Sequence, residues 1–304
     1  MEYVDFVSVI EREVNTRLEG GVSAKVNKVL KNNGTWKQNI TLKRAGCSTA
    51  PAIYLEEFYD SFCRGNSIDC VVEELLHFYD TLEPTPELNL DFLSDYTTVQ
   101  QKILPKLINR EKNIVLLKNV PFVPWKDLAI VFYILLDISE DGMATVLVRN
   151  RNMQDWNVTI QDIFEAAMRN GPCLLPAELL SITDLIEELE ERREKRSRSL
   201  LERNNDSRHV KDEMLVLTNQ FRNFGAVCIT YPCMMEMIAK LLGDSYYILP
   251  SSVHEMIVVP ARCGIGLDEF AEMICEINAT RVEAEEVLSE HPYYYDRKKG
   301  ELSL

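Results

Sequence analysis

The stretch Tyr246-Tyr-Ile-Leu-Pro-Ser-Ser-Val-His-Glu-Met-Ile-Val-Val-Pro260 holds two short apolar runs on either side of a polar insert. Runs of this length that are rich in Tyr, Ile and Val and bounded by proline are typical of buried β-strands. Pro250 has no N–H to donate to a neighbouring strand, so we expect the chain to leave the sheet there and Pro260 to end the second strand. The stretch therefore predicts two strands joined by a polar turn.

The polar insert brings four chemically active side chains together, namely Ser251, Ser252, His254 and Glu255. A hydroxyl close to an imidazole and a carboxylate has the residue types of a nucleophile, a base and an acid. Catalytic triads, however, join residues that are distant in sequence, and the chain contains no Gly-x-Ser-x-Gly turn. A Pro-Ser-Ser turn closed by a hydroxyl explains the same residues without chemistry. The insert is the best candidate for a hydrolase-like or ligand-binding site, without a reaction assigned to it.

The motifs for metals and cofactors are incomplete. His254-Glu255 begins like a zinc-protease motif, but Val258 stands where that motif needs its second histidine. Cys228 and Cys233 lie among apolar residues without a second pair, which favours buried structural thiols over metal ligands. Cys263-Gly-Ile-Gly266 lacks the third glycine of a dinucleotide-binding loop. We therefore expect no metal and no cofactor.

The composition indicates an ordinary globular protein with a net charge of −15 over 304 residues, which disfavours binding to nucleic acid or to an anionic membrane. The start of the chain lacks the pattern of a secretory signal, and the longest apolar run, residues 128–136, is too short to span a bilayer. Eight scattered cysteines without a C-x-x-C pair suit reduced, mostly buried thiols. We expect a soluble protein in the cytoplasm.

The charges are unevenly distributed along the chain. Residues 20–55 contain six cations and no acid, and Asn33-Gly34 between two alternating runs predicts a basic β-hairpin there. Trp36 is either a stacking ring or a cross-strand packing partner. The overall acidity makes nucleic acid an unlikely partner. The possible interaction surface consists of Lys25, Lys28, Lys31, Trp36 and Lys37.

The stretch that follows, residues 56–95, contains eleven acids and one cation, Arg64. This stretch raises the alternative of an acidic DNA mimic that inhibits a nucleic-acid enzyme. The acids lie on amphipathic helical patterns, so solvated helix faces explain them equally simply.

The order of the hydrophobic patterns predicts an α+β fold with antiparallel sheets and packed helices. We expect helices at residues 3–18, 51–64, 67–79, 95–109, 159–169, 176–189, 232–242 and 267–278. We expect strands at residues 22–31, 35–43, 114–117, 128–138, 144–148, 214–217, 225–231, 246–249, 256–259 and 293–295. Residues 282–288 fit a short helix or a strand.

These elements suggest four segments along the chain. Residues 1–95 form an N-terminal helix–hairpin–helix subdomain, and residues 96–186 form a middle antiparallel sheet with helices. Residues 187–212 are a charged helix end or linker, because mixed charges without an apolar face are typical of solvated segments. Residues 213–304 form a C-terminal α+β domain.

Six segments spread along nearly the whole chain are Val29–Gly34, Pro51–Leu55, Lys106–Asn109, Leu215–Asn219, Ile248–Glu255 and Tyr293–Asp296. Together they resemble a bacterial family that is catalogued as a domain of unknown function, the family numbered 5688. The resemblance implies a bacterial cytoplasmic setting and a single architecture, and it brings no activity, cofactor or catalytic residue. Because no catalytic motif is complete, we expect a non-enzymatic protein that binds or regulates another protein.

Overall fold

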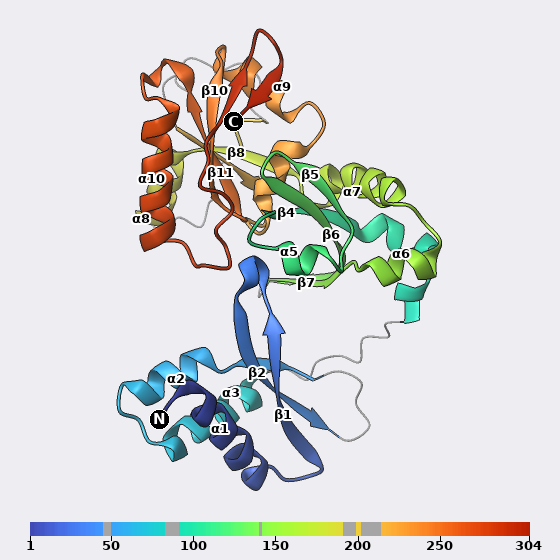
Figure 1. Ribbon diagram of the computed structural model, residues 1–304, viewed down its shortest axis with the longest axis vertical. Helices are drawn as coiled ribbons and strands as arrows, with labels where there is room; N and C mark the ends of the chain where they lie inside the picture. Colours follow the sequence, from blue (N-terminus) through green and yellow to red (C-terminus); the bar gives the residue numbers. More distant parts are fainter. Residues whose placement is uncertain (45–49, 83–90, 140–141, 191–198, 202–213) are drawn as a thin grey trace. The chain divides into compact units, whose positions relative to one another are not determined.

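The computed structural model describes residues 1–304 except 45–49, 83–90, 140–141, 191–198 and 202–213 (Figure 1). The chain forms two compact units, Met1–Asp91 and Phe92–Leu304. All the strand pairings among the described residues are antiparallel, and helices pack on the sheets. The predicted α+β fold is confirmed.

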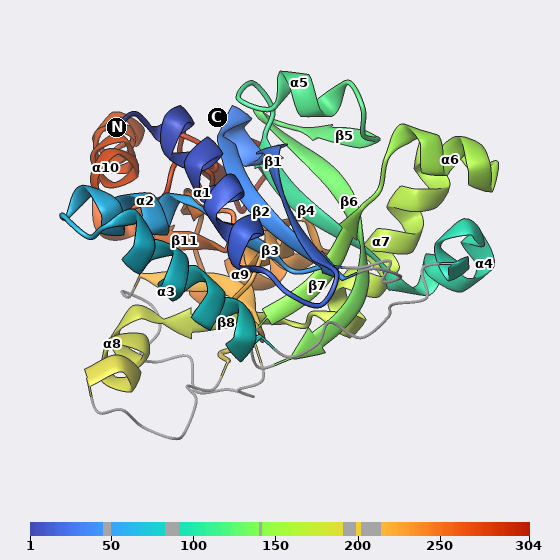
Figure 2. The same ribbon diagram turned by 90° about the horizontal axis from the view of Figure 1, so that it is seen from below.

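The first unit is a three-stranded sheet covered by helices. Its elements are α1 (Tyr3–Arg17), β1 (Val22–Leu30), β2 (Trp36–Arg44), β3 (Ala52–Tyr54), α2 (Glu56–Cys63) and α3 (Ile68–Thr81). Helix α1 lies along β1 (Figure 2), where the Asn15 side chain bonds to both backbone groups of Ala24. Phe6 and Ile10 of this helix share a core with Ile40 of β2. The apolar stripes of the sequence thus become the inner faces of the helices and sheet.

The helix expected from Pro51 begins only at Glu56, so that prediction was wrong for residues 51–55. These residues add β3 to the edge of β2, with Ile53 opposite Ile40 and Tyr54 opposite Asn39. Ile53 is buried in this strand, and it would also have been buried in the expected helix. The burial pattern of so few residues therefore does not separate the two conformations.

The second unit begins with a four-stranded sheet built around the long strand β6. Its elements are α4 (Tyr96–Val99), β4 (Ile103–Asn109), α5 (Ile114–Leu117), β5 (Phe122–Trp125), β6 (Leu128–Ser139), β7 (Gly142–Leu147), α6 (Asn150–Trp156) and α7 (Ile160–Leu174). Strand β6 lies between β4 and β5 and pairs with both of them. Strand β7 also pairs with β6. Thr159 and Asp162 form a reciprocal capping box that begins α7.

Two predictions in this region were wrong. Residues 103–109, expected in a helix, form β4, and Pro105 is tolerated because β4 is the end strand of its sheet. Residues 114–117, expected as a strand, form the short helix α5. The Asn113 side chain turns the chain there by donating to the carbonyl of Asn109 at 2.8 Å. Helix α7 also continues past residue 169, through Pro172 to Leu174.

A six-stranded sheet completes the second unit, in the order β13-β12-β10-β11-β9-β8. Its elements are β8 (Ala177–Ser181), α8 (Ile182–Glu190), β9 (Leu215–Asn219), α9 (Met234–Leu242), β10 (Tyr246–Ser252), β11 (Glu255–Pro260), α10 (Leu267–Thr280), β12 (Tyr293–Asp296) and β13 (Glu301–Ser303). The predicted strand pair β10–β11 lies in the middle of this sheet. The chain does not leave the sheet at Pro250; it shifts register between Leu249 and Ser252 and continues.

Further differences concern short apolar runs. Residues 177–181, expected in a helix, form β8, and residues 225–230, expected in a strand, form a 3-10 helix. Residues 282–288 form neither a helix nor a strand. The two sides of the expected 187–212 linker lie in one sheet, because β8 pairs with β9. Most of that linker, residues 191–198 and 202–213, lies outside the described residues.

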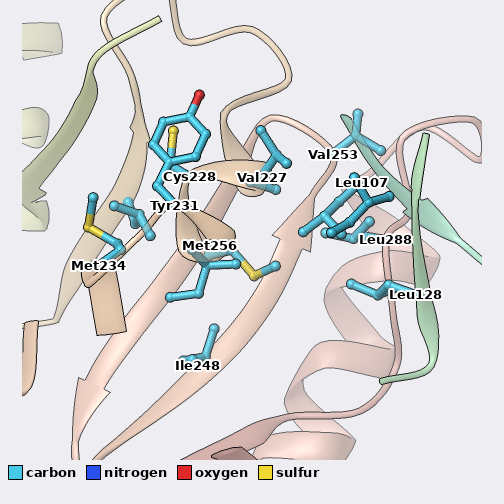
Figure 3. Packing of buried hydrophobic residues seen from close by; sticks show 14 of the residues in the cluster. Leu107, Leu128, Val227, Cys228, Tyr231, Met234, Ile248, Val253, Met256 and Leu288 are labelled. Atoms are coloured by element: carbon cyan, nitrogen blue, oxygen red, sulfur yellow. The ribbon is translucent and has the colours of Figure 1, made fainter. Parts of the chain in front are cut away.

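One hydrophobic core joins both sheets of the second unit. Leu107 and Leu128 from the four-stranded sheet belong to the same cluster as Ile248 and Met256 from the six-stranded sheet (Figure 3). The 3-10 helix at 225–230 is buried in this core and contributes Val227 and Cys228. The expected middle and C-terminal segments therefore share one core.

Tyr133 on β6 is a buried side chain whose hydroxyl has no hydrogen-bond partner among the described residues. Burial strongly raises the pKa of this phenol. Because the hydroxyl was desolvated without compensation, we expect Tyr133→Phe to raise the free energy of unfolding by about 1 kcal/mol. Urea unfolding of both proteins measures this difference, and a loss of stability in the variant would contradict it.

Candidate functional site

The imidazole of His254 lies in the turn between β10 and β11 and is held at both ring nitrogens. Its Nδ1 accepts the backbone N–H of Phe224 at 3.2 Å, so the neutral ring carries its proton on Nε2. Nε2 lies 3.3 Å from Oε1 of Glu286 and donates to it. These two interactions fix the orientation of the imidazole. The His254 side chain is 29% exposed, so the ring is partly accessible to solvent.

The two serine hydroxyls take part in the turn and do not bond to the imidazole. Ser252 Oγ accepts the backbone N–H of His254 at 3.1 Å. Ser251 Oγ donates to Oε1 of Glu255 at 3.4 Å. The structure thus places the four predicted residues in one turn, with hydrogen bonds that hold its shape. In this arrangement His254 does not activate the hydroxyl of either serine.

The groups around His254, besides Glu286, come from β4, β9 and the tight segment after β9, and none of them was among the predicted site residues. The Phe224 ring stacks on the imidazole with centroids 5.6 Å apart and an interplanar angle of 15°. Lys106 Nζ lies 3.6 Å from the centroid of the same ring. Thr218 Oγ1 donates to the carbonyl of His254 at 2.8 Å. These residues are 30 or more positions from His254, so no local spacing marks them.

The backbone of this segment is unusual. Arg222 and Phe224 have φ angles of 51° and 55°, in the left-handed region that bulky residues rarely adopt. The Asn219 side chain stabilises the turn, since its Oδ1 accepts the N–H of Phe221 at 2.9 Å and its Nδ2 donates to the carbonyl of Asn223 at 2.7 Å. Strain of this kind persists only where the surroundings over-determine the backbone.

A second polar cluster, also missed from the sequence, surrounds the carboxylate of Asp127 before β6. Its Oδ1 accepts the hydroxyl of Tyr293 and its Oδ2 accepts that of Ser289, both at 2.6 Å. His291 Nδ1 lies 3.5 Å from Oδ2. Tyr293 and Ser289 are fully buried, and burial together with the neighbouring carboxylate raises the pKa of Tyr293. Asp127 is more than 160 residues from these partners.

This cluster forms part of a polar pocket of about 340 Å³. The pocket is lined by Asn109, Glu111, Lys112, Asp127, Glu290 and His291. The imidazole of His291 is 66% exposed, with its Nδ1 beside Asp127. Ser289 is not a free nucleophile, because its hydroxyl donates to Asp127 and accepts the N–H of His291. The pocket offers carboxylates, an ammonium group and an imidazole to a small polar molecule.

The described residues contain no group of three or more His, Cys, Asp or Glu that is arranged to hold a metal ion. The seven described cysteines are free thiols, and Cys228 is the buried one among them. The expectation of mostly buried thiols was therefore wrong for the described part of the chain, and Cys233 is exposed. Burial raises the pKa of Cys228 to about 12, which makes this thiol unreactive near neutral pH.

The predicted hairpin, β1–β2, carries aromatic rings with ammonium groups beside them. Lys28 Nζ lies 4.8 Å from the ring centroid of Trp36, whose side chain is 54% exposed. Lys31 Nζ and Lys37 Nζ lie 4.3 and 5.9 Å from the centroid of Tyr54. Lys25 is exposed on β1. Tyr54 was missed because residues 51–55 were expected in a helix.

In the described part of the chain, no helix is both long enough and apolar enough to span a membrane. The model of a family described as a family of unknown function (DUF5688) matches residues 3–297. No curated protein and no solved structure matches the chain.

Proposed function

The chain belongs to the DUF5688 family of unknown function, whose model spans nearly its whole length, and we propose that it is a non-enzymatic cytoplasmic protein that binds an acidic surface of another protein. The proposed contact surface is the basic hairpin, which presents Lys28 and Trp36 on one side of the β1–β2 pair and Lys25, Lys37 and Tyr54 on the other, with Lys31 directly after β1.

The observation that carries this proposal is the half-exposed ring of Trp36 with Lys28 beside it. When a partner covers an exposed tryptophan, a large apolar surface is removed from water. Tryptophan is accordingly enriched among the residues that contribute most of the binding energy of interfaces. An ammonium group 4.8 Å from the ring is already positioned to meet a carboxylate at the edge of such a contact.

The distribution of charge selects the kind of partner. All 48 acidic residues of the chain lie outside residues 20–55, so an anionic partner is attracted to the hairpin. A compact acidic patch on a protein fits such a local site. A long nucleic acid would extend past it onto acidic surface, which supports a protein as the partner.

The alternatives receive less support. The hydroxyls of Ser251 and Ser252 are engaged in the turn, which argues against a hydrolase at that site. The acids of α2 and α3, such as Glu57 and Glu73, are exposed opposite buried residues such as Phe58, as expected for solvated helix faces. The part of the acidic stretch at residues 83–90 lies outside the described residues.

The test compares the wild-type protein with Trp36→Ala and Lys28→Glu in capture from a lysate of its source organism after nuclease treatment. We expect one acidic protein to be retained by the wild type and lost from both variants. With that protein purified, Trp36→Ala should weaken its binding about 30-fold in calorimetry, since an interface hot spot contributes about 2 kcal/mol. Binding should also weaken with added salt.

Phe78→Ala is the matched control, because Phe78 is an aromatic residue of the same unit that is 46% exposed on α3, outside the basic hairpin. It should bind like the wild type. Equal binding by Trp36→Ala would overturn the proposal, and so would capture that occurs only when the nuclease treatment is omitted.

A further inference from the structure

A groove of about 500 Å³ lies beside α5 in the second unit, and nothing above gives it a role. The surface inside it is mostly apolar, and the residues that line it are Arg110, Glu111, Ile114, Leu117, Lys118 and Phe122. The groove lies within the range of volumes that small-molecule sites usually have.

The floor of the groove is firmly built. Leu117 packs with Val120 and with Ala129 and Val131 of β6 in a small hydrophobic cluster, and Phe122 packs against the same cluster. By contrast, Ile114 is 55% exposed on α5 at the groove wall. Because Ile114 is a large aliphatic side chain exposed beside an apolar floor, a ligand that covers it lowers the free energy by removing apolar surface from water.

The rim of the groove is cationic. Arg110 and Lys118 line it together with one acid, Glu111. The lining thus holds two cations and one acid, although the chain as a whole carries a net charge of −15. A ligand that complements both features has an apolar body and one anionic end.

We propose that this groove binds an amphiphilic carboxylate, a medium-chain fatty acid anion whose tail covers Ile114, Leu117 and Phe122 and whose carboxylate faces Arg110 and Lys118. The floor residues provide affinity through burial of methylene groups, and the two cations provide selection for the charged end. Neither the apolar floor nor the two cations belong to the basic hairpin, so the proposal is independent of the proposed function.

The test is calorimetric titration of the full chain with hexanoate, octanoate and decanoate below their micelle concentrations. Each added methylene should tighten binding about fourfold, from about 0.8 kcal/mol per buried group. Decanol, which has the same tail without the charge, should bind more weakly than decanoate. Raising the salt concentration should reduce the difference between the two.

Variants separate the two parts of the site. Arg110→Gln with Lys118→Gln should weaken decanoate about fivefold and leave decanol unchanged. Ile114→Asn should weaken both ligands about tenfold. The matched controls are Val115→Asn, because Val115 is 59% exposed on the same helix but is not among the lining residues, and Lys112→Gln, because Lys112 Nζ lies 3.0 Å from Glu290 at the other pocket.

Two results would overturn the proposal. One is binding that does not depend on chain length or on Ile114, which would indicate that the groove is not the site. The other is equal affinity for decanol and decanoate in the wild-type protein, which would show that the groove does not recognise an anionic group. Trp36→Ala should leave all these affinities unchanged.

Discussion

Gly225→Ala should destabilise the protein by about 4 kcal/mol, at the upper end of what a single substitution does. A Cβ atom on Gly225 would lie 2.3 Å from Oγ1 of Thr218, 2.6 Å from the backbone N of Asn219 and 2.7 Å from the carbonyl O of His254. Two of these atoms belong to backbone, so no side-chain rotation relieves the overlap. Either β9 or the β10–β11 turn has to move, and overpacking that displaces a buried strand is among the most costly single substitutions.

The measurement is urea unfolding followed by circular dichroism, with Gly266→Ala as the matched control. Nothing lies within 4 Å of a Cβ on Gly266, and its φ of −92° suits any residue. That control should change the free energy of unfolding by no more than about 1 kcal/mol, because alanine only caps α10 less well than glycine. If both variants unfold at the same urea concentration, the tight packing at Gly225 is not as described.

Asp127→Ala should lower the free energy of unfolding by about 3 kcal/mol. The substitution removes the acceptor of two hydroxyls, those of Tyr293 and Ser289, both fully buried. Hydrogen bonds to a charged acceptor contribute about 1.5–3 kcal/mol each, and a buried donor without an acceptor keeps its desolvation cost. The carboxylate also ties the turn before β6 to the segment that leads into β12, so its loss loosens two sheets together.

A double-mutant cycle with Tyr293→Phe isolates one of these bonds. In the Asp127→Ala background Tyr293→Phe should cost about 1–2 kcal/mol less than in the wild type, because the hydroxyl is then already unpaired. Glu290→Ala is the control, since this residue pairs with Lys112 at the surface of the same pocket with a half-exposed side chain. It should cost less than about 1 kcal/mol. Additive effects of Asp127 and Tyr293 would contradict the hydrogen bond.

Sequence patterns predicted the parts of the fold where a local signal and the tertiary environment agree. The Asn33-Gly34 turn joins two paired strands, and the apolar runs before and after the Ser251–Glu255 insert form the central strands of the large sheet. Long amphipathic patterns such as α1 and α10 were also predicted with nearly the observed bounds. In each of these, one face is apolar over enough residues to define a period.

The wrong assignments are short apolar runs whose conformation depends on neighbours. Residues 114–117 and 177–181 have no period long enough to separate a helix from a strand. Strand β8 exists because β9 offers it an edge, and α5 exists because the chain turns at Asn113. Pro105 suggested a kinked helix, yet a proline is equally suited to the end strand where β4 lies.

By itself the sequence determined the α+β class, the two hairpins, the basic and acidic halves of the first unit, and the family to which the chain belongs. Only the tertiary structure decided which residues surround His254 and Asp127, and which apolar side chains remain exposed to solvent at α5. The physical reason is that side-chain periodicity and turn chemistry act over a few residues. The hydrogen bonds of a site join atoms that packing brings together, here from positions 30 to 166 residues apart.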